Sequence, residues 1–127
     1  MTGTVDVVNT LCDSPDVAAV TFVGSSRVAE LVADRCHRAH KKVLALGGAK
    51  NHLVALPDCD VDMAARDIVA SFAGCCGQRC MAASVLLTVG DCDQLIERVA
   101  ELTRPLTRGQ EAGQVGPVID AISKARV

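Results

Sequence analysis

Apolar and polar positions along this chain form blocks that predict strands and amphipathic helices in alternation. An apolar, β-branched run at residues 18–23 predicts a short buried strand, which Gly24-Ser25-Ser26 ends. The next apolar positions are spaced i, i+3, i+4 and i+8, as on one face of a helix: Val28, Leu31, Val32 and Cys36. Ser25 or Ser26 is a candidate cap for the first turn of this helix. A second strand at 43–46, ended by Gly47-Gly48, completes a strand–helix–strand unit, which favours parallel pairing through a right-handed crossover.

The rest of the chain repeats this order of elements. The further elements are a strand at 52–56, a helix at 61–72, an irregular turn at 74–80, a strand at 84–89, and helices at 95–102 and 119–127. Asp60 is a plausible N-cap for the helix at 61–72. Strands and helices that alternate in this way are typical of the α/β class.

Composition and charge exclude several classes of partner. Half of the residues are apolar, so a core can be buried, but two Phe without Tyr or Trp leave little to stack on nucleic-acid bases. Thirteen Lys or Arg against fifteen Asp or Glu give a net charge of −2 and no basic surface for nucleic acid or membranes. No signal peptide is visible, and no apolar run approaches the roughly 20 residues that span a bilayer. We therefore expect a soluble, cytoplasmic protein that binds neither nucleic acid nor a membrane.

The chain has seven cysteines, an odd number without regular spacing, which does not indicate a disulfide framework. We expect most of them to be small buried hydrophobic residues. A zinc site could be drawn from His37 and His40, which share a helix face, or from Cys76 and Cys80. The cysteine spacing matches no usual zinc motif and the histidines lie in a polar run, so no metal is expected.

Three stretches, in order, resemble the aldehyde dehydrogenase superfamily. They are Phe22-Val23-Gly24-Ser25, Leu46-Gly47-Gly48-Ala49-Lys50-Asn51-His52 and Gly77-Gln78-Arg79-Cys80-Met81-Ala82. The third resembles the active-site cysteine signature of the family, and Gly116-Pro117 fits a landmark further along. The second resembles the methylmalonate- or malonate-semialdehyde branch, whose members transfer the acyl group to CoA. The resemblance extends from about Asp16 onward.

This resemblance implies an internal fragment of a longer enzyme with an aldehyde-dehydrogenase-like fold. Residues 1–48 would be the C-terminal part of the NAD-binding domain, a partial Rossmann-type unit, and residues 49–127 the start of the catalytic α/β domain. The family's Lys at the adenosine ribose, its oxyanion-hole Asn, its ribose-binding Glu and its oligomerisation strands would lie outside this chain. For the full-length parent, the resemblance implies a small semialdehyde substrate, NAD as cofactor, CoA as co-substrate and a homo-oligomer.

Cys80 is the candidate nucleophile. Oxidation of an aldehyde through a covalent intermediate needs a soft nucleophile, which forms a thiohemiacetal that then gives up a hydride. A thiol suits this role when positive charge or backbone amides lie close, and Arg79 is adjacent. The amide of Cys80 could itself donate to the oxyanion. The alternative is a buried structural cysteine, and the resemblance favours the nucleophile.

Arg79 and Leu46 bear on the substrate and on the acyl acceptor. Guanidinium pairs with carboxylate through two hydrogen bonds, so Arg79 could hold the carboxylate of a malonate-type semialdehyde; a solvated loop arginine is the alternative. Leu46 lies 34 residues before Cys80, where the resemblance places the general-base Glu of the hydrolytic enzymes. Without that base, the thiol of CoA, a better nucleophile than water, is the expected acceptor.

Gly24 and Ser25 are the candidate cofactor-binding residues. They lie where a strand meets a helix N-terminus, whose unpaired amides and dipole favour an anion, and the resemblance implies that they approach the cofactor pyrophosphate. No G-x-G-x-x-G motif is present, and a capped helix start is the simpler interpretation of the residues alone. Lys50, Asn51 and His52 identify the branch, and no catalytic role is assigned to them.

Three functions are compatible with these residues. The first is a segment of an oxidoreductase that converts malonate or methylmalonate semialdehyde to an acyl-CoA, carbon dioxide and NADH, the isolated segment being inactive. The second is a catalytically inactive truncated fragment that acts as an interaction module. The third is a small thiol redox or metal protein that uses Cys75, Cys76 and Cys80. We also expect an unmatched sheet edge to make the isolated chain associate.

Overall fold

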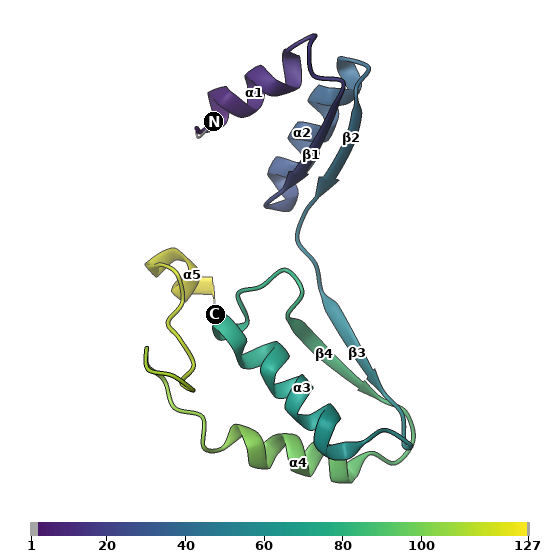
Figure 1. The fold of residues 1–127 in the computed structure, drawn as a ribbon, viewed down its shortest axis with the longest axis vertical. Helices are drawn as coiled ribbons and strands as arrows, with labels where there is room; N and C mark the ends of the chain where they lie inside the picture. Colours follow the sequence, from purple (N-terminus) through teal and green to yellow (C-terminus); the bar gives the residue numbers. More distant parts are fainter. Residues whose placement is uncertain (1–2, 127) are drawn as a thin grey trace. The chain divides into compact units, whose positions relative to one another are not determined.

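The computed structural model describes residues 3–126 and shows two compact units, Met1–Gly48 and Ala49–Val127 (Figure 1). Each unit contains a pair of parallel strands connected through a helix. This combination of helices and parallel strands confirms the predicted α/β class.

The first unit contains the elements α1 (Val5–Asp13), β1 (Ala19–Val23), α2 (Ser26–Arg38) and β2 (Lys42–Leu46). Its two strands pair in parallel, from Ala19 opposite Lys42 to Val23 opposite Leu46, as the strand–helix–strand pattern predicted. The strands differ from the predicted runs by one residue, and α2 extends slightly beyond the apolar positions that predicted it.

Helix α1 is an element that the sequence pattern did not predict. Four of its nine residues are β-branched, three Val and one Thr, and such side chains lose rotamer freedom in a helix. Thr4 before it makes no side-chain capping hydrogen bond. Packing therefore has to hold α1, because Cys12, 1% exposed, is buried in one core with Val32 and Cys36 of α2. Burial raises the pKa of the Cys12 thiol, and the neighbouring Cys36 thiol raises it further.

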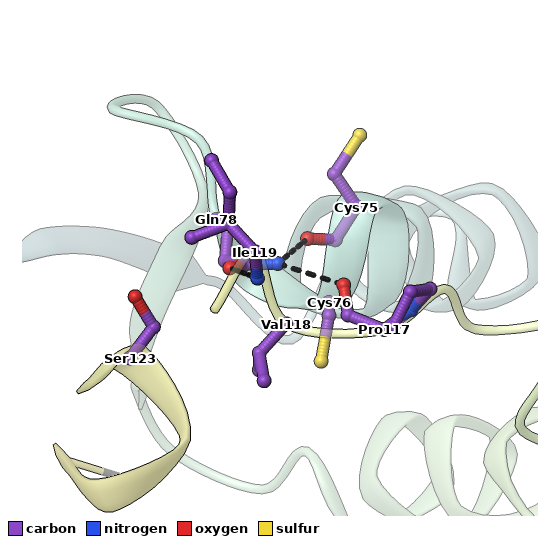
Figure 2. Close-up of a pocket in the computed structure, with 7 residues that line it drawn as sticks. All are labelled: Cys75, Cys76, Gln78, Pro117, Val118, Ile119 and Ser123. Atoms are coloured by element: carbon purple, nitrogen blue, oxygen red, sulfur yellow. Dashed lines mark hydrogen bonds between the residues drawn. The ribbon is translucent and has the colours of Figure 1, made fainter. Parts of the chain in front are cut away.

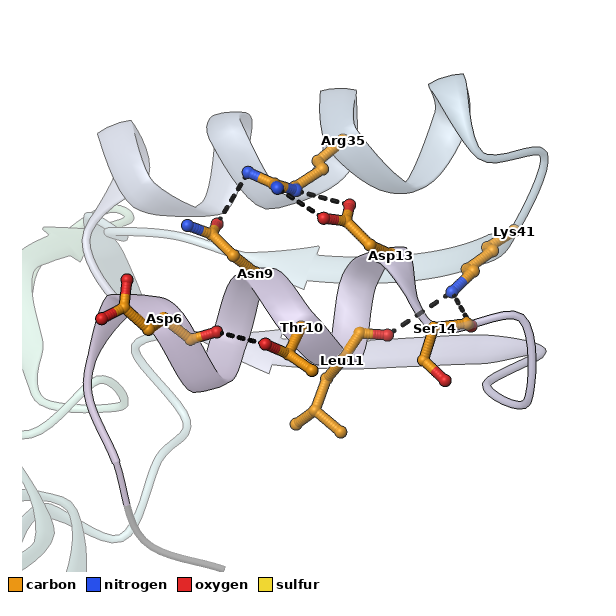
Figure 3. Close-up of polar contacts among 8 residues, drawn as sticks. All are labelled: Asp6, Asn9, Thr10, Leu11, Asp13, Ser14, Arg35 and Lys41. Carbon is orange, nitrogen blue, oxygen red and sulfur yellow. Dashed lines mark hydrogen bonds and ion pairs between the residues drawn. The ribbon is translucent and has the colours of Figure 1, made fainter.

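The side chains of two cationic residues, Arg35 and Lys41, also donate hydrogen bonds to the C-terminal half of α1 and to Ser14 after it (Figure 3). Arg35 of α2 donates from Nε and Nη2 to the two carboxylate oxygens of Asp13, at 2.7 and 2.5 Å, and from Nη1 to Asn9 at 2.9 Å. The ammonium of Lys41 donates to the main-chain carbonyls of Leu11 and Ser14. Cations at the C-terminal end of a helix complement its dipole, so both contacts favour the helical state of α1.

The β1–β2 pair is covered on one face and exposed on the other. Val20, Phe22 and Val43 pack against the core that Cys12 and α2 form. The alternate residues of each strand, which point to the other face, are exposed; among them Val23 is 64% exposed and Leu44 is 56% exposed. The period-2 alternation of a strand thus places one apolar row against the helices and a second one outside.

The second unit contains β3 (Asn51–Ala55), α3 (Val61–Ala73), the short turn η1 (Gly74–Gly77), β4 (Ala83–Thr88), α4 (Asp93–Thr103) and α5 (Ala121–Arg126). β3 and β4 are parallel, with a register shift between Asn51 and His52. The Asp60 side chain accepts a hydrogen bond from the Met63 amide at 2.9 Å, which confirms the predicted N-cap of α3. Of the predicted helix at 119–127, Val127 lies outside the described residues.

The core of the second unit lies where α3 and α4 pack with the strands. Its buried members are Ala55, Ala65, Ile68, Cys92 and Leu95. Arg98 of α4 joins the two helices at the surface, because it pairs with Asp62 of α3 at 2.8 Å and with Glu101 at 2.9 Å.

The seven cysteines fall into three groups. Cys12, Cys36 and Cys92 are buried, Cys59 and Cys76 are half-buried, and Cys75 and Cys80 are exposed, so fewer cysteines are buried than the sequence predicted. No three His, Cys, Asp or Glu side chains in the part of the chain that the structure describes gather as metal ligands would. Within the same residues, no helix has the length and apolarity needed to cross a membrane.

The Asp13–Arg35 contact predicts a pH-dependent stability of the first unit. Hydrogen bonding from Arg35 lowers the pKa of Asp13 below its ordinary value of 3.8. A lowered folded-state pKa contributes stability that is present above the unfolded-state pKa and is lost as the pH falls through the folded-state value. Asp13→Asn should therefore lower the unfolding midpoint, followed by far-UV circular dichroism, at pH 7, and the difference from wild type should shrink below about pH 4.

Asp34→Asn is the matched control, since Asp34 is exposed on α2 and makes the same change of charge. A difference between wild type and Asp13→Asn that stays constant from pH 7 to pH 3 would contradict the contribution of this ion pair.

Candidate active site

Cys80 lies in the second unit, in a turn between η1 and β4. The Ala82 amide donates to the Arg79 carbonyl at 3.0 Å, which closes a four-residue turn over residues 79–82, called here the Cys80 turn. Cys80 is exposed and lines an open hollow of about 590 Å³ together with Asp67, Ala70, Ser71, Arg79 and Met81. The thiol is therefore accessible to a small molecule.

Asn51, the first residue of β3, holds the carbonyl side of the Cys80 turn. Its side-chain Nδ2 donates to the carbonyl of Cys80 at 2.7 Å and to the carbonyl of Ala82 at 3.1 Å. Ser71 Oγ accepts from the amide of Ala83 at 2.9 Å, just beyond the turn. Side chains from β3 and α3 thus satisfy main-chain groups that the β3–β4 ladder does not pair.

Arg79 lies over the C-terminal end of α3. Its Nη2 donates to the carbonyls of Ala70 and Ser71 at 2.6 and 3.0 Å, two of the helix's last carbonyls. A Cβ on Gly74 would lie 2.3 Å from this Nη2, so glycine there allows the guanidinium to approach the backbone. The sequence predicted a substrate anchor or a solvated loop arginine, and this capping contact was not foreseen.

The turn before Cys80 has an unusual backbone. Cys75 and Cys76 have φ angles of 52° and 54°, the left-handed region that glycine adopts at less cost, and Gly77 follows at 69°. Each non-glycine residue in this region costs about 1–2 kcal/mol. Such a conformation persists where surrounding contacts enforce it.

The side chain of Gln78 supplies such contacts (Figure 2). Its Nε2 donates to the carbonyls of Cys75 at 3.1 Å and Pro117 at 3.2 Å, and its Oε1 accepts from the Ile119 amide at 2.8 Å. The Gln78 amide also donates to the Cys75 carbonyl at 3.0 Å. One side chain therefore joins the strained turn to the segment at residues 117–119.

Gly24 and Ser25 lie in the first unit, between β1 and α2. The Gly24 amide donates to the Leu46 carbonyl at 3.1 Å, and a Cβ on Gly24 would lie 2.6 Å from the Phe22 ring. Ser25 is the N-cap residue, but its side chain makes no capping hydrogen bond, so the predicted side-chain cap is wrong. The hydroxyl of Ser26 instead accepts from the Gly48 amide at 2.9 Å. The side chain of the N-cap residue therefore accepts no hydrogen bond from the first-turn amides of α2.

Residues 1–127 match the profile of the aldehyde dehydrogenase family. The chain belongs to this family. The match confirms the resemblance inferred from the three sequence stretches.

The relatives of this aldehyde dehydrogenase chain include enzymes of one branch. Malonate-semialdehyde dehydrogenase 1 of Geobacillus thermodenitrificans is 44% identical over 98% of this chain and 26% of its own length. Malonate-semialdehyde dehydrogenase of Pseudomonas aeruginosa is 38% identical, with the same two coverages. The chain spans about a quarter of the length of these relatives.

Solved aldehyde dehydrogenase structures share the fold. Methylmalonate-semialdehyde dehydrogenase of Oceanimonas doudoroffii is 38% identical with a TM-score of 0.80, over 92% of this chain and 25% of that one. A Sinorhizobium meliloti protein assigned to the same activity, crystallised with NAD, is 33% identical with a TM-score of 0.84, over 98% and 26%. An NADP-dependent enzyme of E. coli is 27% identical with a TM-score of 0.85, over 99% and 27%.

The structure adds three residues to the site that the sequence did not assign. Asn51 and Gln78 contact the backbone around Cys80, and Asp67 contributes a carboxylate to the hollow beside it. Asn51 and Gln78 lie inside the recognised motifs, which was the available signal, but motif membership does not reveal a contact. Asp67 carries no such signal, since it is one of the two acidic residues on α3 and lies outside the motifs.

The Gln78 contacts predict that Gln78→Ala loosens the segment at residues 117–119. A net hydrogen bond contributes about 1 kcal/mol, so the Ile119 amide should exchange its hydrogen about fivefold faster. Hydrogen-exchange mass spectrometry of peptides that contain Ile119 measures this. Gln94→Ala is the control, because Gln94 is exposed on α4 and has no part in these contacts. Equal exchange in wild type and Gln78→Ala would show that Gln78 does not hold the segment.

Proposed function

We propose that this chain is a segment of an NAD-dependent, CoA-acylating malonate- or methylmalonate-semialdehyde dehydrogenase, with Cys80 as its nucleophile. The observation that carries the proposal is an exposed thiol, held in the turn of the family's cysteine signature, in a chain whose relatives carry these activities. The first 48 residues would belong to the cofactor domain and residues 49–127 to the catalytic domain. A cytoplasmic homo-oligomer is the expected form of the full-length parent.

In this mechanism Cys80 attacks the aldehyde carbon, and the carbonyl oxygen becomes an alkoxide in a thiohemiacetal. The main-chain amide of Cys80 is a candidate donor to that oxygen. Bound NAD would supply the hydride acceptor, which leaves an acyl thioester on Cys80. The thiol of CoA then takes the acyl group, and its proton restores the Cys80 thiol. The substrate carboxylate is lost as carbon dioxide, and a proton from solvent takes its place on the α carbon.

Arg79 is the proposed partner of the substrate carboxylate. Its Nη2 is engaged with the α3 carbonyls, so Nη1 and Nε are the groups that would donate to an incoming carboxylate. The helix contact would also keep the guanidinium beside the thiol, since both side chains line the same hollow. The carboxylate of Asp67, which lines this hollow, would repel the carboxylate of a substrate unless that carboxylate pairs with Arg79.

Leu46 supports CoA rather than water as the acyl acceptor. It ends β2 and presents a hydrocarbon side chain that is 47% exposed. A carbon side chain cannot remove a proton from water, whereas a thiol needs less activation to attack a thioester.

The start of α2 fits the pyrophosphate of a dinucleotide. Its first-turn amides lack a capping side chain. Gly24 lets the backbone pass close to the Phe22 ring, where a Cβ would clash. A helix N-terminus with such amides favours an anion. NAD is the proposed cofactor because it is bound in the Sinorhizobium meliloti structure, although the E. coli neighbour uses NADP.

Selective alkylation tests the assignment of Cys80. Iodoacetamide at pH 7, with peptide mapping by mass spectrometry, should label Cys80 on the order of tenfold faster than Cys75. Both thiols are exposed in the second unit, so Cys75 corrects for access, and the buried Cys92 reports whether the chain is folded. Equal rates at Cys80 and Cys75 would remove the chemical basis of the proposal.

The 127-residue chain alone should form no NADH from malonate semialdehyde, NAD and CoA. The reason is that it spans about a quarter of the relatives named for this activity, so most of the fold that would hold the dinucleotide is not in this sequence. Absorbance at the NADH band, compared with Cys80→Ala, measures the outcome. NADH formation that Cys80→Ala abolishes would contradict this expectation and would support the nucleophile.

A further inference from the structure

We propose that Asn51 is the positioning residue of the nucleophile: it fixes the peptide plane that follows Cys80. This inference rests on the proposed role of Cys80. From the sequence, Asn51 had no role beyond marking the branch, whereas in the structure its side chain donates to the carbonyl of the reacting residue itself.

The donor capacity of Asn51 is fully used on the nucleophile turn. A side-chain amide carries two N–H donors, and Nδ2 directs hydrogen bonds to the carbonyls of Cys80 and Ala82. Within residues 3–126, no other side chain donates to the Cys80 carbonyl. The orientation of that carbonyl therefore depends on Asn51.

That orientation matters because Cys80 and Met81 are the two central residues of the Cys80 turn. Turns of types I and II differ by rotation of the central peptide, so the closing hydrogen bond from Ala82 to Arg79 does not by itself choose between them. All peptide bonds of the described chain are trans, so a carbonyl directed at Asn51 sends the Met81 N–H to the opposite side. Asn51 thus selects which end of this peptide dipole faces away from β3.

The strand register explains how Asn51 reaches the turn. Asn51 pairs with Ala83 and His52 with Val85, so one residue of β4, Ser84, is extra at this point. Such a bulge bends a strand locally and redirects its side chains, and bulges are frequent next to active sites. Asn51 is half-buried there, and its hydrogen bond to the Ala82 carbonyl is partly buried with it.

The consequence for reactivity is electrostatic. When Asn51 is absent, the central peptide can rotate, and in part of the population the carbonyl oxygen of Cys80 turns away from β3. A carbonyl oxygen near the thiol disfavours the thiolate and an adjacent oxyanion. Asn51 therefore keeps a partial negative charge away from the site without touching the substrate.

Asn51→Ala and Asn51→Asp test the proposal in the full chain. Both variants should lower the ratio of Cys80 to Cys75 alkylation rates about fivefold, the effect of one lost hydrogen bond. Asn9→Asp is the matched control, because Asn9 in α1 is the other asparagine of the chain and this change adds the same charge. Cys92 should stay unlabelled in all three variants, since it is buried in the core of the second unit.

A spectroscopic signature separates positioning from a general loss of structure. Cys80–Met81 is the one Cys–Met pair in the sequence, so protein labelled with carbonyl-13C cysteine and 15N methionine gives a single cross-peak for that peptide. Loss of the Asn51 hydrogen bond should move its carbonyl resonance upfield in both Asn51 variants and leave it in place in Asn9→Asp.

An unchanged cross-peak or an unchanged rate ratio in both Asn51 variants would overturn the proposal. Labelling of Cys92 in step with Cys80 would also overturn it, because Asn51 would then serve the fold as a whole. Wild-type Cys80 that reacts no faster than Cys75 would refute the proposed nucleophile, whereas the cross-peak would still report whether Asn51 sets the peptide.

Discussion

The structure of the candidate site depends on one constraint: the turn that carries Cys80 cannot satisfy its main-chain polar groups through a helix or a sheet. Side chains have to do so instead. Asn51 donates to the carbonyls of the turn, Ser71 accepts from an amide just beyond it, and Arg79 donates to carbonyls at the end of α3. Because these groups come from β3, α3 and the turn itself, the backbone at Cys80 is determined by packing within one unit. An exposed thiol with an ordered backbone results, which is the combination that a positioned nucleophile requires.

Side-chain contacts also hold the backbone before the nucleophile, where two residues adopt a strained conformation. Two cysteines adopt a conformation that would suit glycine, and the Gln78 side chain returns hydrogen bonds to the Cys75 carbonyl and to a distant segment. A sequence with glycine at 75 and 76 would form this turn at lower cost. Strain that neighbouring contacts enforce is typical of active sites, and here it lies within five residues of the proposed nucleophile.

Much of the fold could be predicted from periodicity, whereas the contacts of the site could not. The β1–α2–β2 unit followed from an apolar run, a helix stripe and glycine pairs, because these local patterns agree with the packing. Helix α1 escaped prediction because its Val and Thr residues disfavour a helix, and contacts with distant residues stabilise it: burial of Cys12 against Cys36, and the hydrogen bonds from Arg35 and Lys41. Asn51 and Cys80 are 29 residues apart, and their hydrogen bond depends on a bulge in β4 that no local pattern encodes.

Both units leave one face of their strand pair open. Val23 and Leu44 are 64% and 56% exposed in the first unit, and Val54 and Leu87, which pair with each other, are 61% and 47% exposed in the second. Parallel sheets in α/β proteins are normally covered on both faces, so further covering would stabilise both units. The hydrogen bonds that hold the Cys80 turn come from β3, α3 and the turn itself. The geometry at Cys80 therefore depends on the packing of the second unit.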